Sequence, residues 1–214
     1  QHLAKVTLTL NADTTLPNTT AELPKAINQG STHKITLSDT VDISSVVITN
    51  YEELALADGG DATMSVTQHN SFSNILATGT NQITLSDAGT LTGAAAVETY
   101  VLAGGGGTTF TLGDASQNVT SGNGADTIDF AGLSADGVVT TNAADTLVLD
   151  EGADISLVDA EGNGAGTAFT ANAMTLTTER TGGAGGNTDG SRVTMSVAQH
   201  NSVTITAGGT ADQI

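Results

Sequence analysis

Four apolar residues recur at intervals of nine along the middle of the chain: Val101, Phe110, Val119 and Ile128. The stretches between them are rich in Gly, as in Gly104–Gly107. An amphipathic helix needs apolar residues every three or four positions, and runs of Gly destabilise it. Short strands joined by tight turns and stacked in parallel produce this spacing, because each strand then contributes one or two inward side chains. The sequence therefore predicts an all-β protein, a parallel β-solenoid of the β-roll or β-helix type with short strands and Gly- and Asp-rich turns.

The composition favours a narrow interior. Aromatic residues make up 3% of the 214 residues and Trp is absent, whereas Gly occurs 26 times. With so few large side chains, a wide globular core is hard to fill at the density of protein interiors. Strands are expected at Val6–Leu10, Val46–Thr49, Thr109–Leu112, Asp126–Phe130, Leu147–Leu149, Ile155–Val158, Met174–Thr177, Val193–Val197 and Val203–Thr206.

A long internal repeat accompanies the short one. Met64–Ser71 returns almost unchanged as Met195–Ser202, 131 residues later, and Ile35–Asp39 reappears as Ile83–Asp87. Self-similarity of this kind is typical of proteins built from stacked structural units.

The repeats and the charges together predict three parts. Residues 1–34 hold three of the five basic residues and both Pro residues, which indicates a differently folded starting segment or an arm that contacts a partner. Residues 35–190 are predicted to form the β-solenoid, with turns that are degenerate versions of one nine-residue pattern. Residues 191–214 are predicted to start a further long repeat that is continuous with the solenoid.

The chain is strongly acidic. Its 23 Asp and Glu residues against 5 Lys and Arg residues give a formal net charge of −18 at pH 7. Nucleic acids and anionic lipid surfaces repel such a polyanion, which excludes both as partners. No apolar run approaches the roughly 18 residues that a membrane-spanning helix needs. Because there is no Cys, disulfides, thiolate catalysis and zinc–sulfur sites are excluded too.

Most Asp residues stand beside Gly, Ala or Ser in turn-like stretches, where a short carboxylate can bond its own backbone. Two interpretations stay open: the charges provide solubility, or cations neutralise the turns. Stacked turns bring like positions to about 4.8 Å, so neighbouring carboxylates repel unless a cation bridges them. Oxygen ligands without Cys favour a hard ion such as Ca²⁺.

One segment matches a known calcium-binding pattern. Ser121–Asp129 reads Ser-Gly-Asn-Gly-Ala-Asp-Thr-Ile-Asp, which fits the nonapeptide Gly-Gly-x-Gly-x-Asp-x-apolar-x at every fixed place except the first. In these residues the chain resembles the RTX (repeats-in-toxin, haemolysin-type calcium-binding repeat) family of bacterial type I secreted proteins, and within it S-layer and adhesin proteins. The resemblance implies calcium ions between successive turns, bound by Asp carboxylates and by the backbone carbonyls of Gly-rich turns.

The predicted ligands lie in three turns. A coil of about 18 residues predicts a partner for Asp126 near position 144, and Asn142–Leu147 repeats Asn123–Ile128 at an offset of 19. Asp114 is a further candidate, although Gln117 stands where its turn should carry Asp. Turn chemistry of Asn and Gly alone is the alternative explanation. The predicted Ca²⁺ ligands are Gly122, Asn123, Gly124, Asp126, Asn142, Asp145 and Asp114.

No constellation predicts catalysis. The chain lacks a Gly-x-Ser-x-Gly nucleophile motif, and Gly104–Gly107 lack the Lys-Ser/Thr ending of a phosphate loop. His69 and His200 lie 131 residues apart with no second His close to either, which favours a structural role in a turn or cap. We therefore predict that the chain is not an enzyme and has no catalytic or organic-cofactor site.

These observations predict a non-enzymatic, secreted, calcium-stabilised structural protein of the bacterial cell surface, such as an S-layer, filament or adhesin segment. The strand edges at the ends of a solenoid are templates for pairing. The expected partners are therefore copies of the chain itself, joined end to end or laterally, with cell-surface glycan as a further candidate. The alternative is a ligand-binding module, for ice or carbohydrate, of a type I secreted adhesin. Pairs such as Thr109/Thr111 place two hydroxyls on one strand face, in an array similar to that of ice-binding β-solenoids, although plain β-propensity also explains them.

Overall fold

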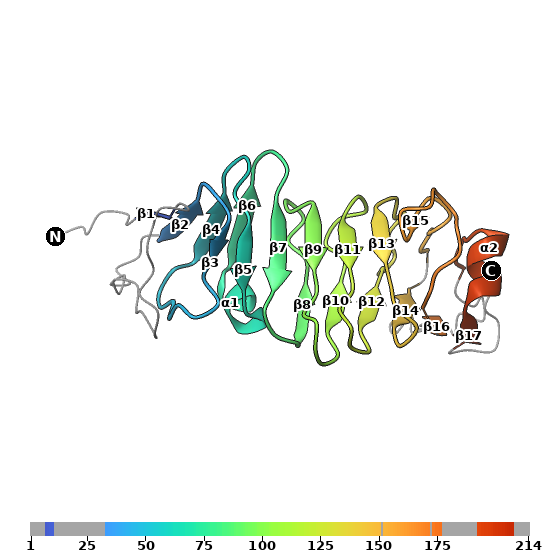
Figure 1. The fold of residues 1–214 in the computed structure, drawn as a ribbon. Helices are drawn as coiled ribbons and strands as arrows, with labels where there is room; N and C mark the ends of the chain where they lie inside the picture. Colours follow the sequence, from blue (N-terminus) through green and yellow to red (C-terminus); the bar gives the residue numbers. More distant parts are fainter. Residues whose placement is uncertain (1–6, 11–32, 151, 172, 177–191, 208–214) are drawn as a thin grey trace, which may run out of the picture.

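The structure, a computed structural model, describes residues 7–10, 33–150, 152–171, 173–176 and 192–207. The chain winds into a stack of coils that runs from the N-terminal to the C-terminal end (Figure 1). Every pairing between named strands is parallel, because each strand lies against the equivalent strand of a neighbouring coil. The predicted parallel β-solenoid is therefore confirmed.

The named strands belong to three sheets, and within each sheet they follow one another in chain order along the stack. Sheet 1 contains β1 (Thr7–Leu10), β2 (Lys34–Leu37), β4 (Glu53–Leu56) and β6 (Asn74–Ala77). Sheet 2 contains β3 (Val41–Asp42), β5 (Ala62–Met64), β7 (Gln82–Leu85), β9 (Thr99–Val101), β11 (Asn118–Thr120), β13 (Val138–Thr140) and β15 (Asp159–Ala160). Sheet 3 contains β8 (Thr90–Thr92), β10 (Thr109–Thr111), β12 (Thr127–Asp129), β14 (Thr146–Leu149), β16 (Ala173–Leu176) and β17 (Thr204–Ala207).

The nine-residue spacing arises because successive strands face each other across the coil. Phe110, Val119 and Ile128 are the central residues of β10, β11 and β12, and all three are buried. Val101 departs from the predicted pattern, since it is only half-buried at the end of β9. Its neighbour Tyr100 takes the inward place and pairs in register with Val119.

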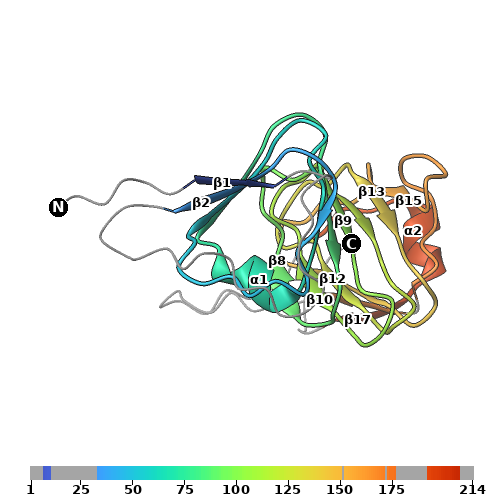
Figure 2. The ribbon, with the colours of Figure 1, turned by 60° about the vertical axis from the view of Figure 1, so that its left-hand side comes forward.

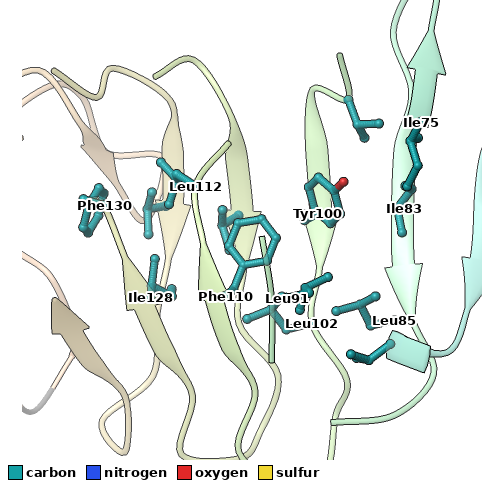
Figure 3. Packing of buried hydrophobic residues seen from close by; sticks show 14 of the residues in the cluster. Ile75, Ile83, Leu85, Leu91, Tyr100, Leu102, Phe110, Leu112, Ile128 and Phe130 are labelled. Carbon is teal, nitrogen blue, oxygen red and sulfur yellow. The ribbon is translucent and has the colours of Figure 1, made fainter. Parts of the chain in front are cut away.

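The core is a narrow row of side chains between the facing sheets (Figure 3). Tyr100 and Phe110 are fully buried, and their ring centroids lie 4.8 Å apart. Further along, Phe130 and Phe169 meet edge to face with centroids 6.4 Å apart. Aromatic pairs at such distances add stabilisation beyond the burial of their area. A few large residues can therefore fill a coil this narrow.

The stack changes its cross-section at one coil. The consecutive strands β6, β7 and β8 belong to sheets 1, 2 and 3. Sheet 1 has no further strand after β6 in the described part of the chain, and sheet 3 begins at β8. Figure 2 shows β1 and β2 on one side of the early coils and the first helix, α1, on another. The early coils thus have a wider outline than the later ones, which alternate between sheets 2 and 3.

Two short helices, α1 (Val66–Ser71) and α2 (Val197–Ser202), occupy the two copies of the long repeat. Each begins with a capping box. In the first copy Gln68 N–H donates to Ser65 Oγ at 3.1 Å, and Ser65 N–H donates to Gln68 Oε1 at 2.8 Å. The second copy repeats both bonds. Among the described residues, no helix has the length and apolar character to cross a membrane.

The predicted strands at Val46–Thr49 and Ile155–Val158 are wrong, because the chain turns corners there. Val46 and Val158 each donate their N–H to the carbonyl three residues earlier, at 2.9 and 3.0 Å, and both side chains are buried. Val193–Val197 forms no named strand either, because α2 begins within it. In these segments Val46, Ile155, Val158 and Val193 are buried, whereas Val47, Leu157 and Val197 are exposed.

The predicted outer parts both contribute strands to the stack. β1 lies within the predicted segment 1–34 and pairs in parallel with β2. At the other end, β17 pairs with β16 and so continues the solenoid beyond residue 191. Residues 1–6, 11–32, 191 and 208–214 of these two parts lie outside the described residues.

Candidate metal centre

The two strongest predicted ligands lie in stacked corners. Asp126 and Asp145 immediately precede β12 and β14, whose first residues pair in register. Both side chains are buried, with 1% and 0% of their surface exposed. Asp126 N–H donates to Asp145 Oδ1 at 2.9 Å. The structure therefore brings together the pair that the offset of 19 residues singled out.

Each of these carboxylates is already bonded at both oxygens. Asp126 Oδ1 accepts from Thr108 N–H at 2.7 Å, and Asp126 Oδ2 accepts from Gly122 N–H at 2.9 Å. Asp145 Oδ2 accepts from Asn142 N–H at 2.7 Å, in addition to its Oδ1 bond. Backbone N–H groups thus compensate the two buried charges, as charge-assisted hydrogen bonds do at helix caps. Each carboxylate ties its own corner to the coil before it.

The amide of Asn142 lies between the same two corners. Its Nδ2 lies 2.7 Å from Gly122 O, 3.0 Å from Gly124 O and 3.0 Å from Asp145 Oδ1. Its Oδ1 accepts from Ala144 N–H at 2.7 Å. These bonds fix the orientation of the amide, because the reverse orientation would place its oxygen against three other oxygens.

As arranged, this donor set does not fit a calcium ion. Ca²⁺ takes six to eight oxygen ligands at about 2.3–2.6 Å that converge on one point. Here the carboxylate oxygens accept from N–H groups, and the two Gly carbonyls accept from an amide. In the part of the chain that the structure describes, no three His, Cys, Asp or Glu side chains gather as a metal group. Calcium binding at this corner stays a prediction.

The remaining predicted ligands have other surroundings. Asn123 is exposed. Gly122 and Gly124 allow close stacking, since a Cβ at either position would collide with the backbone carbonyl of Ala103 or Gly106. Asp114 lies at the opposite corner of the coil, between β10 in sheet 3 and β11 in sheet 2. The structure therefore does not bring Asp114 together with the Asp126–Asp145 pair.

Asp114 closes its own turn. Its Oδ1 accepts from the N–H of Ser116 at 3.0 Å and from the Ser116 hydroxyl at 2.7 Å, and these two bonds lower the pKa of the carboxyl. Asp42 and Asp154 make the same backbone bond to the residue two positions later, each at 2.9 Å. These carboxylates close their turns by bonding the backbone two residues later, as short carboxylates in turns commonly do.

Gln117, which replaces the expected Asp, holds its corner by a bond pattern like that of Asn142. Its Nε2 donates to Ala94 O at 2.8 Å and to Val97 O at 3.0 Å, one coil earlier. Its Oε1 accepts from Gly113 N–H at 2.7 Å. The side chain is 1% exposed. Gln117 therefore departs from the nonapeptide pattern but still bonds its corner to the preceding coil.

Sequence analysis missed three further amides of this kind. Gln68 Nε2 donates to Ile43 O at 2.6 Å and to Val46 O at 2.7 Å. The other two bonds are Asn81 Nδ2 to Ala57 O and Gly60 O, at 2.6 and 2.8 Å, and Gln199 Nε2 to Ile155 O at 2.7 Å. We call these five side chains the amide clamps: Gln68, Asn81, Gln117, Asn142 and Gln199. The long repeat marks Gln68 and Gln199 and the Ser-x-x-Gln spacing indicates a helix cap, but neither signal shows that the amides bond carbonyls of another coil.

Glu side chains also link successive coils, by accepting hydrogen bonds from backbone N–H groups. His33, Asn81 and Thr141 donate their N–H groups to Glu52, Glu98 and Glu161 of the next coil at 2.8, 2.9 and 3.0 Å. The bond from His33 is the largest cause of a lowered pKa at Glu52. Much of the acidic character thus serves contacts between neighbouring coils.

A hollow of about 590 Å³ opens at the step where sheet 1 ends, between the His69–Leu76 segment and the Thr92–Ala96 corner. Among the described residues that line it, His69 alone is titratable. His69 Nε2 and the Tyr100 hydroxyl are hydrogen-bonded at 3.1 Å, and the hydroxyl oxygen accepts from Ala94 N–H at 2.7 Å. Burial lowers the pKa of His69 and so favours the neutral ring. Because its ring nitrogen is bonded to Tyr100, the His69 side chain links α1 to the coil that follows it.

Comparison with known proteins identifies no relative: no family model, no curated protein and no solved structure matches the chain.

Proposed function

We propose that this chain is a non-enzymatic structural protein of the bacterial cell surface, secreted from the cell, whose copies join end to end. The RTX-like nonapeptide, the net charge of −18 and the absence of Cys support the extracellular setting. The parallel stack supports end-to-end joining, because its outermost strands have one edge that no strand within the described residues covers. Calcium is left out of this proposal, since the corner oxygens are already bonded.

The observation that carries the proposal is the different exposure of one element in its two copies. In the first copy a following coil covers α1. Val66 N–H donates to Asp87 Oδ1 at 2.7 Å, and Asn70 Nδ2 donates to Thr90 O at 2.9 Å. The Val66 side chain lies directly against Gly89. It is only 7% exposed.

The second copy presents the same face to solvent. Val197, the equivalent of Val66, is 76% exposed, and His200 and Asn201 are exposed as well. Because a following coil covers this face in the first copy, the same face in the second copy is complementary to a further coil. Among the described residues, Val197 is the most exposed of the large apolar side chains.

The occupant that we propose for the α2 face is the opposite end of a second copy, where β1 and β3 are the outermost described strands. The charges agree with this pairing. Residues 192–207 contain Arg192 and no acid, whereas β3, the outermost described strand of sheet 2, contains Asp42. Head-to-tail contact between unlike surfaces does not close on itself, so it produces filaments.

Sedimentation velocity and negative-stain microscopy over a concentration series test the proposal. The unmodified chain is expected to form linear oligomers, and Val197→Asp is expected to weaken association at least about tenfold by placing a charge in the contact. Val138→Asp is the matched control, because Val138 is 36% exposed on the outer face of sheet 2, at the side of the stack. A monomer at every concentration, or equal effects of the two variants, would contradict end-to-end joining.

A second candidate, an ice- or carbohydrate-binding module, has one observation in its favour. The register of sheet 3 places Thr90, Thr109, Thr127 and Thr146 in one column, and Thr92 beside Thr111 in the next. Parallel strands repeat such hydroxyls about every 4.8 Å. Inhibition of ice growth by the isolated chain, lost in Thr109→Tyr, would favour this function over a purely structural one.

A further inference from the structure

The Asn142 amide lies where a cation between two turns would be expected. Its Nδ2 has four oxygen neighbours within 3.5 Å, from Gly122, Gly124, Asp145 and Ser121. These oxygens come from two successive corners. Any group that bridges them must be electropositive, and an amide N–H₂ with its two donors meets that need without a net charge.

The buried carboxylates of the same column need no cation either. The link between Asp126 and Asp145 runs through the Asp126 N–H, so a donor lies between the two charges. Thr108, Gly122 and Asn142 supply the other three N–H groups. These backbone N–H donors offset the repulsion between the two carboxylates, which was the reason to predict a metal ion.

The same solution recurs along the stack. Gln68, Asn81 and Gln117 each bridge two carbonyls of the preceding coil, as Asn142 does. Their side chains are between 1% and 9% exposed. Buried amides that bond two carbonyls each are costly to remove, because the carbonyls then lose their partners. The amide clamps occur both in the wide early coils and in the narrow later coils.

We infer that the amide clamps take the place of bound calcium, so that the coils of this solenoid stack without a metal and Asn142 occupies a cation position. The inference concerns the stability of one chain and does not depend on whether copies join. A metal-dependent solenoid unfolds when calcium is removed, since metal binding adds directly to its stability. This solenoid keeps its stability when calcium is removed.

Thermal unfolding by circular dichroism, with millimolar Ca²⁺ or with EGTA, tests the inference. The unmodified chain is expected to melt at the same temperature in both buffers, within about 2 °C. Asn142→Asp replaces the amide nitrogen by oxygen and leaves a cage of oxygens alone. It is expected to melt at least about 5 °C lower in EGTA and to regain most of that loss with Ca²⁺.

Two controls separate the clamp from general damage. Asn142→Ala loses the Nδ2 bonds and also the Oδ1 bond from Ala144 N–H, but it gains no oxygen, so calcium should not restore its melting temperature. Asn123→Asp adds a carboxylate at an exposed neighbouring position and should melt like the unmodified chain in both buffers.

Either of two results would overturn the inference. The first is a fall in the melting temperature of the unmodified chain in EGTA that Ca²⁺ reverses. The second is an Asn142→Asp variant that folds but gains nothing from Ca²⁺, which would show that Asn142 does not occupy a cation position. If the variant does not fold, the unmodified chain in the two buffers still decides.

Discussion

The two copies of the long repeat form the same helix in two different environments. Both helices have six residues, a Ser cap and a Gln that completes the capping box. In α1, Val66 is 7% exposed and His69 5%, whereas in α2 Val197 is 76% exposed and His200 lies in solvent. The local sequence therefore determines the helix, and the presence of a following coil determines whether its outer face becomes core.

A charge at the outer face should separate the two copies most strongly. Val66→Asp is expected to lower the free energy of unfolding by about 3 kcal/mol or more, because it buries an unpaired carboxylate against Gly89. Val197→Asp should change it by less than about 0.5 kcal/mol, since this position is exposed. Urea unfolding of the monomer at low protein concentration measures both values. Similar losses would mean that α2 is covered as fully as α1.

Removal of the Gln clamps should have the next largest effect. Gln68→Ala is expected to cost about 2 kcal/mol, because Ile43 O and Val46 O both lose a donor inside the stack. Gln199→Ala should cost about 1 kcal/mol, since within the described part of the chain Gln199 donates one such bond, to Ile155 O. Chemical unfolding provides the comparison.

Gln68→Glu is the matched control for this prediction. It keeps the oxygen that accepts from Ser65 N–H, and it replaces the donor N–H₂ by a carboxylate oxygen that faces Ile43 O and Val46 O. A loss as large as that of Gln68→Ala would assign the stabilisation to the clamp. A loss near zero would assign it to the capping box and contradict the role of the clamp.

The smallest expected difference between the two copies is in how much their His residues make the stability of the chain depend on pH. Burial lowers the pKa of His69, so the unfolded chain binds this proton more readily than the folded chain. The stabilisation is complete above the ordinary His pKa of about 6.5 and declines as the pH falls below it. His69→Gln should reduce the slope of stability against pH between 7 and 5, and His200→Gln, at the exposed equivalent, should leave it unchanged. Equal slopes in the unmodified chain and in both variants would show that unfolding does not change the pKa of His69.

Much of the fold could be predicted because its signals are local and repeated. The spacing of Phe110, Val119 and Ile128 reports a strand on each side of a narrow coil, and the offset between Asp126 and Asp145 reports the length of one coil. The helices escaped notice although the Ser-x-x-Gln capping signal was present, since the surrounding β-branched residues favour strands. The corners at Val46 and Val158 were mistaken for strands for the same reason.

The candidate site could be located from the sequence, but its chemistry could not be derived. The motif at Gly122–Asp126 identifies a corner of acidic and Gly residues, and this is compatible with a cation or with hydrogen bonds. Which of the two applies depends on where the amide of Asn142 points and on which N–H groups face Asp126. Those directions are fixed by the coil on either side.

By itself, the sequence determined the period of the coils, the inward places of Phe110, Val119 and Ile128 and the stacking of Asp126 on Asp145, because each follows from spacing along the chain. Only the tertiary structure decided that side-chain amides bridge the corners, that sheet 1 gives way to sheet 3 at β8, and that one copy of a repeated helix is core and the other surface. The physical reason is that these outcomes depend on contacts between coils about twenty residues apart, where a single hydrogen-bond donor or one covering strand changes the environment without changing the local sequence.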